Sequence, residues 1–157
     1  SGMFVRNIKE FKKKTNKKII LCLDCGKKRV GIAISDENHG ISMPMKTIER
    51  NNEFNSKILH IIFEYNVGGI VIGLPINENK KINKMIQFIK DISKNLDLFL
   101  DNKDCDIPIV FWDESFSSLE AEIISEQFFT NRKAQKKKLD QFAAKVILED
   151  FINNNYN

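Results

Sequence analysis

The stretch IILCLDCGKKRVGIAIS, residues 19–35, decides the fold, because it contains two strands joined by a tight turn. Residues 19–24 are continuously apolar except for one carboxylate, Asp24, which is the pattern of a short strand buried on both faces. Residues 25–28 supply the turn, and residues 30–34 form the second strand. An ionised carboxylate at the end of a buried strand is unfavourable unless something pairs with it. Asp24 therefore either caps the turn or holds a cation.

The rest of the chain predicts a mixed sheet with helices over its later strands. A turn at 36–40 and a short strand over 43–48 complete an antiparallel meander. Apolar residues at helical spacing predict helices over 52–66 and 81–99. The other predicted elements are strands over 68–75 and 107–113 and helices over 116–129 and 139–152. This order is typical of an α/β domain.

The 157 residues are expected to hold one domain, over residues 19–152, since single domains commonly run about 100–200 residues. Residues 1–18 are expected to form a basic, solvated N-terminal arm, in which Ser1-Gly2 looks like the remnant of an expression tag. Residues 153–157 are expected to be a polar tail. We expect a cytoplasmic protein. Localisation in an organelle is the alternative, because a targeting segment upstream of this sequence would be removed on import.

Composition narrows the possible partners and cofactors. No apolar run approaches the roughly 18–20 residues that span a bilayer, so no membrane partner is expected. The net charge of +4 favours a nucleic-acid partner only weakly. Cys22 and Cys25 form a C-x-x-C motif without a second pair or suitably spaced histidines, which favours reduced thiols over a zinc or redox site. The oligomeric state is open between a monomer and a weak dimer.

Four acidic residues stand at positions that suit a site. Asp24 ends the first strand, and Asp113 and Glu114 end the last, where ligands of open α/β sheets bind. Either of the latter two could instead simply begin a loop. Asp140 lies on the apolar stripe of the last predicted helix and so faces the sheet. Its alternative role is that of a first-turn carboxylate complementing the helix dipole.

These acids can converge if the last helix packs over the sheet. Neighbouring carboxylates repel one another unless cations neutralise them. Clusters of oxygen ligands suit Mg²⁺ or Mn²⁺, and such ions support phosphodiester cleavage. We therefore expect Asp24, Asp113, Glu114 and Asp140 to be both metal ligands and catalytic residues.

A run of cations directly precedes Asp140. Its members are Arg132, Lys133, Lys136, Lys137 and Lys138. Charge runs are usually solvated loops, but beside a carboxylate metal site such a loop would hold the phosphates of a nucleic acid. Lys27, Lys28 and Arg29 are expected to add to the same nucleic-acid-binding face.

Four motifs together resemble one known family. LDCGKKRVGIAIS (23–35), VIGLPIN (71–77), DESFSS (113–118) and DQFAA (140–144) occur in the order seen in the YqgF (RuvX-like) family of RNase H-like nucleases. The resemblance extends over residues 19–152 and implies an RNase H-like fold, a five-stranded mixed sheet with its first three strands antiparallel and helices on both faces. It also implies that Asp24 is the first-strand catalytic aspartate, that Asp113-Glu114 occupies the D-E-R position, and that Asp140 is the acid of the D-x-x-A helix motif.

The resemblance also implies the activity. The family is described as maturing the 5′ end of pre-16S ribosomal RNA in bacteria and as resolving Holliday junctions. The leading hypothesis is a nuclease dependent on Mg²⁺ or Mn²⁺ that cleaves structured nucleic acid, with pre-16S ribosomal RNA as its substrate in ribosome biogenesis. One alternative is a Holliday junction resolvase in DNA recombination and repair. The other is a nucleic-acid-binding module with little turnover, because Ser115 stands in place of the arginine of D-E-R.

Overall fold

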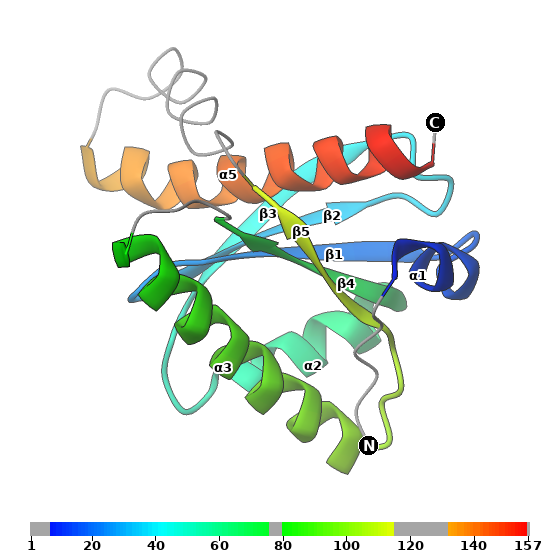
Figure 1. The fold of residues 1–157 in the computed structure, drawn as a ribbon, viewed down its shortest axis with the longest axis horizontal. Helices are drawn as coiled ribbons and strands as arrows, with labels where there is room; N and C mark the ends of the chain where they lie inside the picture. Colours follow the sequence, from blue (N-terminus) through cyan, green and yellow to red (C-terminus); the bar gives the residue numbers. More distant parts are fainter. Residues whose placement is uncertain (1–6, 76–79, 115–131, 157) are drawn as a thin grey trace.

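The computed structural model describes residues 7–75, 80–114 and 132–156. Its elements are α1 (Ile8–Lys14), β1 (Ile19–Cys25), β2 (Arg29–Ser35), β3 (Ser42–Glu49), α2 (Phe54–Tyr65), β4 (Val67–Leu74), α3 (Lys80–Asn102), β5 (Ile109–Asp113) and α5 (Arg132–Asn155) (Figure 1). The helix predicted over 116–129 lies outside the described residues. No helix in the described ranges combines the length and apolarity that crossing a membrane requires.

β1 lies at the centre of a five-stranded sheet with the strand order β3-β2-β1-β4-β5. β1 pairs antiparallel with β2, and β2 pairs antiparallel with β3. β1 pairs parallel with β4, which in turn pairs parallel with β5. The continuously apolar strands β1 and β4 occupy inner positions, where both faces of a strand are covered. The predicted mixed sheet, with its first three strands antiparallel, is confirmed.

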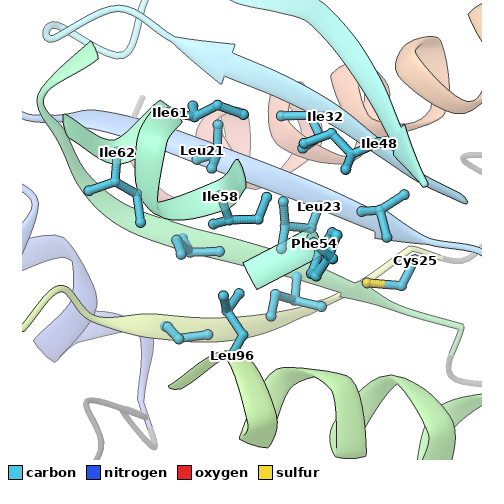
Figure 2. Packing of buried hydrophobic residues seen from close by; sticks show 14 of the residues in the cluster. Leu21, Leu23, Cys25, Ile32, Ile48, Phe54, Ile58, Ile61, Ile62 and Leu96 are labelled. Atoms are coloured by element: carbon cyan, nitrogen blue, oxygen red, sulfur yellow. The ribbon is translucent and has the colours of Figure 1, made fainter. Parts of the chain in front are cut away.

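Helices cover both faces of this sheet, as predicted. α2 and α3 pack on one face, and α5 and α1 pack on the other (Figure 1). Side chains alternate along a strand, so Leu21 and Leu23 of β1 enter the core under α2 and α3, whereas Ile20 and Cys22 enter the core under α5. Figure 2 shows how α2 packs its side chains against those of β1 in the first of these cores.

The expected solvated arm and polar tail both pack more closely than predicted. The arm contains α1, and Phe11 of that helix is fully buried, with its ring 5.5 Å from that of Phe151. α5 continues to Asn155, and the Tyr156 hydroxyl lies 2.5 Å from Thr15 Oγ1. The lysine-rich sequence of the arm predicts exposure, whereas the burial of Phe11 requires the tertiary contact with α5.

The basic segment before Asp140 is helical, and the prediction of a loop there is wrong. α5 begins at Arg132, seven residues before the predicted start of the last helix. Lysine, arginine, glutamine and alanine are all good helix formers, so the segment extends the helix. Asp140 therefore lies well inside α5 and not in its first turn, and the alternative role at the helix dipole does not apply.

Candidate active site

The site is built around Asp24 on the central strand. Asp24 lies two residues after Cys22 on β1 and so shares the sheet face that α5 covers. Glu114 directly follows β5, and its backbone N–H donates to the carbonyl of Leu74 at 2.9 Å. A side-chain hydrogen bond joins Glu114 to Asp24. The ends of β1 and β5 thus bring the carboxyl groups of Asp24 and Glu114 into contact. In the sequence these two strand ends are far apart, since Asp24 and Asp113 are 89 residues apart.

Two glycines flank Asp24 and make room for its partners. Gly31 of β2 is the register partner of Asp24, and a Cβ at Gly31 would lie 1.9 Å from the backbone oxygen of Asp140. A Cβ at Gly73 of β4 would lie 2.9 Å from Ile147 Cδ1 and 3.2 Å from Glu114 Oε2. Gly31 therefore admits the backbone of α5, and Gly73 admits the carboxyl group of Glu114.

Asp140 faces the sheet from α5, as the sequence predicts. Its Oδ2 lies 3.3 Å from Nε of Arg29, and both side chains are about one-third exposed, at 32% and 31%. The negative charge of Asp140 also acts on Asp24, whose pKa it raises. The structure thus brings Asp24, Glu114 and Asp140 to one face of the sheet, with Arg29 as the cation that pairs with the third acid.

The two contacting carboxyl groups share a proton at neutral pH. Burial raises the pKa of Asp24 from 3.8 to about 6, the charge of Asp140 adds to the rise, and the hydrogen bond to Glu114 acts against it. Burial also raises the pKa of Glu114 from 4.5 to about 9, with further contributions from the charge and hydrogen bond of Asp24 and from the charge of Asp113. Glu114 therefore remains protonated near pH 7 and donates to Asp24.

The structure describes only some of the remaining predicted site residues. Asp113 is exposed and pairs in register with Leu74, so it influences Glu114 through its charge. Lys27, Lys28 and Lys138 are exposed. The side chains of Arg132, Lys133, Lys136 and Lys137, and the whole of Ser115, lie outside the described part of the structure.

The donor atoms of the site fit a hard divalent cation. Glu114 Oε2 is buried and, within the described residues, has no hydrogen-bond partner. This oxygen also lies beside a second carboxyl group, that of Asp24. A bound Mg²⁺ or Mn²⁺ would offset the cost of burying the carboxylate charge and the repulsion between the two carboxylates. In the described ranges, no three His, Cys, Asp or Glu side chains come close enough together to enclose a metal ion. Asp24 and Glu114 form a pair instead, and the third acid, Asp140, contacts Arg29.

The two cysteines of the C-x-x-C motif are free and buried. Cys22 packs in the core under α5, whereas Cys25 packs in the core under α2 and α3. Burial and the nearby charges of Asp24 and Glu114 raise the pKa of both thiols. Thiols on opposite faces of one strand, held in their neutral form, suit neither a disulfide nor a zinc site.

Sequence reasoning missed the two glycines and the pairing of Arg29. A glycine inside a strand weakens that strand and often marks a place where another chain segment approaches closely. Gly31 and Gly73 carry this signal, but their partners come from α5 and from the end of β5, which local sequence does not reveal. Arg29 was assigned to nucleic acid alone, although its guanidinium already contacts Asp140.

Comparison with protein families adds an independent observation. The family model described as RuvX, Holliday junction resolvase, matches residues 18–154. The chain belongs to the RuvX family. A relative from Pelagibacter ubique, named "Putative pre-16S rRNA nuclease", is 37% identical over 153 residues, which cover 94% of this chain and 98% of the relative. A protein of the same name from Mycoplasma mobile is 39% identical over 140 residues, covering 85% of this chain and 91% of that one.

A solved structure places the RuvX-family chain in a wider fold group. The structure described as T. thermophilus RuvC in complex with Holliday junction substrate superposes with a TM-score of 0.50 and 6% sequence identity. The match covers 87% of this chain and 95% of RuvC. At this identity the similarity concerns the fold alone, and it confirms the predicted RNase H-like architecture.

Proposed function

We propose that this RuvX-family protein is a divalent-metal-dependent nuclease that hydrolyses phosphodiester bonds in structured nucleic acid, with precursor 16S ribosomal RNA as its substrate. The relatives that cover almost the whole chain carry the name of a pre-16S rRNA nuclease. Work on a ribosomal precursor in ribosome biogenesis would make the cytoplasm its place of action.

One observation carries the proposal, namely the contact between the carboxyl groups of Asp24 and Glu114. Two acids in contact on a largely buried face do not help the fold, because burial raises the pKa of both and the charge and hydrogen bond of Asp24 raise the pKa of Glu114 further. Such an arrangement is found where function requires it, and perturbed carboxyl groups cluster at catalytic sites. The buried, unpartnered Oε2 of Glu114 adds the atom that a cation would bind.

In this proposal Asp24 and Glu114 hold Mg²⁺ or Mn²⁺, and Asp113 and Asp140 complete its surroundings. When bound, the metal would supply a nucleophile at neutral pH and charge stabilisation at the phosphate. Glu114 would lose its shared proton on binding, Asp24 would orient the site from the rigid central strand, and Asp140 would close it from α5. Lys27, Lys28 and the cations of α5 would neutralise the phosphates on either side.

The test offers purified protein a precursor 16S ribosomal RNA fragment with Mg²⁺, with Mn²⁺, or with a chelator. We expect cleavage with either metal and none with the chelator. Asp24→Asn should abolish cleavage, whereas the matched Asp106→Asn change, on an exposed loop before β5, should leave it intact. Cleavage that survives Asp24→Asn would reject the assignment of the site.

A second candidate function is the resolution of Holliday junctions, which the matching family description names. A four-way DNA junction in the same assay separates the two substrates. Cleavage of the junction alone, abolished by Asp24→Asn, would replace ribosomal RNA with branched DNA. Binding of either nucleic acid without any cleavage would favour the binding module, with Ser115 in the position of the family's arginine.

A further inference from the structure

Arg50, directly after β3, contacts every carbonyl group of the turn that follows β1. Its Nη1 donates to the carbonyl of Lys27 at 2.5 Å and approaches that of Gly26 at 3.4 Å. Its backbone N–H donates to the carbonyl of Lys28 at 2.9 Å. One residue therefore holds the backbone of residues 26–28 at three successive points.

The other side of Arg50 is held by α3. Its guanidinium carbon lies 4.0 Å from the centre of the Phe88 ring, at the distance of a stacked cation–π contact. A planar guanidinium can stack on an aromatic ring with its face while its edge donates hydrogen bonds, which an ammonium group cannot do. Arg50 thus connects the turn to a helix of the α2/α3 layer.

This turn is where the proposed catalytic and nucleic-acid-binding residues meet. It begins after Asp24-Cys25 and ends at Arg29, which pairs with Asp140. The turn itself contributes one cross-strand bond, from the N–H of Gly26 to the carbonyl of Arg29 at 2.8 Å. Its two lysines, Lys27 and Lys28, are exposed. A short turn with exposed cations needs an external contact if those cations are to keep fixed positions.

We propose that Arg50 is a positioning residue that clamps the turn at residues 26–28 and thereby presents Lys27 and Lys28 to the nucleic-acid backbone. This role rests on the nuclease function proposed above. Arg50 does not itself contact the phosphates, because its side chain is engaged by the turn carbonyls and by Phe88. Immobilised cations bind a polyanion without first losing conformational freedom, so the clamp strengthens substrate binding.

The test compares Arg50→Lys with Lys103→Met. Lys103 is a matched control, because its ammonium group also lies over a phenylalanine of α3, at 5.7 Å from the centre of the Phe99 ring. Amide hydrogen exchange is followed at Gly26 and Arg50, whose N–H groups bond within the clamped region, and at Ile70 of β4 as a core reference. These measurements need no substrate, so they test the clamp even if the nuclease proposal fails.

In Arg50→Lys we expect exchange at Gly26 and Arg50 to rise roughly tenfold or more, since hydrogen bonds from a charged donor are lost. Exchange at Ile70 and the melting temperature should stay unchanged, and Lys103→Met should resemble the wild type throughout. Binding of the precursor RNA should weaken in Arg50→Lys although the charge is retained. Phe88→Leu should produce the same local pattern.

Three results would overturn the proposal, and a fourth would overturn its substrate-binding part alone. Unchanged exchange at Gly26 in Arg50→Lys would remove the clamp. Acceleration that includes Ile70 would reveal a global loss of stability instead of a local role. If Arg50→Lys bound RNA as tightly as the wild type, residue 50 would act through its positive charge, as a residue in direct contact with a phosphate does. A wild-type protein that binds no RNA would reject the nuclease proposal and the presentation of lysines, while the exchange data would still decide whether Arg50 holds the turn.

Discussion

Gly31→Ala should separate α5 from the sheet at the point where the site closes. The new Cβ would lie 1.9 Å from the backbone oxygen of Asp140, whereas real Cβ contacts are essentially never shorter than 3.0 Å. The two segments must therefore move apart by at least about an ångström. Farther along α5, Ala144, Ile147 and Phe151 are fully buried, so we expect the movement to concentrate around Asp140.

The expected result is a large loss of activity with a moderate loss of stability. A misplacement of about 1 Å in a catalytic constellation can lower the rate about 100-fold, and we expect a loss of that order in cleavage of precursor RNA. Overpacking should lower the free energy of unfolding by about 1–3 kcal/mol. Both quantities are measured on the same preparation, the first by gel assay under saturating Mg²⁺ and the second by denaturant unfolding.

Gly40→Ala is the matched control for this change. A Cβ at Gly40 would meet Asp36 Oδ2 at 3.8 Å, which is an ordinary contact, so the variant should behave as the wild type. A Gly31→Ala protein that cleaves at the wild-type rate would refute the reasoning, because it would show that close approach of α5 at Asp140 is not needed. Isothermal titration with Mg²⁺ provides a second readout, and weaker metal binding is expected in Gly31→Ala alone.

Three further predictions concern the acids and the N-terminal helix. Asp24→Asn should raise the melting temperature of the metal-free protein while it abolishes cleavage, because the change removes a charge from a crowded carboxyl pair; a lower melting temperature would contradict this. With a chelator present, the free energy of unfolding should fall as the pH rises from 4.5 to about 9, because Glu114 binds its proton more tightly in the folded state. Urea unfolding measures this pH dependence, and Glu114→Gln should make it less steep. Phe11→Ala should lower the free energy of unfolding by about 3–5 kcal/mol in the same assay, whereas Lys9→Ala, at an exposed position, should have little effect. Equal effects of the two changes would argue against α1 as part of the core.

The positions of the acids could be predicted to different degrees. Asp24 was placed correctly because a continuously apolar strand reveals its own end. Asp140 was placed on the buried face of its helix because helical periodicity is a local property. The sequence assigns both Asp113 and Glu114 to the site. In the structure Glu114 is hydrogen-bonded to Asp24, whereas Asp113 is exposed.

The order of the five strands and of α2, α3 and α5 followed from the sequence, as did the choice of side chains available for a site, because hydrophobic period and side-chain chemistry are properties of neighbouring residues. The close approach at Gly31, the clamp of Arg50 on the turn and the burial of Phe11 are instead decided by the tertiary structure. Each of these depends on strand register or helix placement, which join residues far apart in the chain. The sequence thus determines which groups are available for chemistry, and packing between distant segments determines which of them meet.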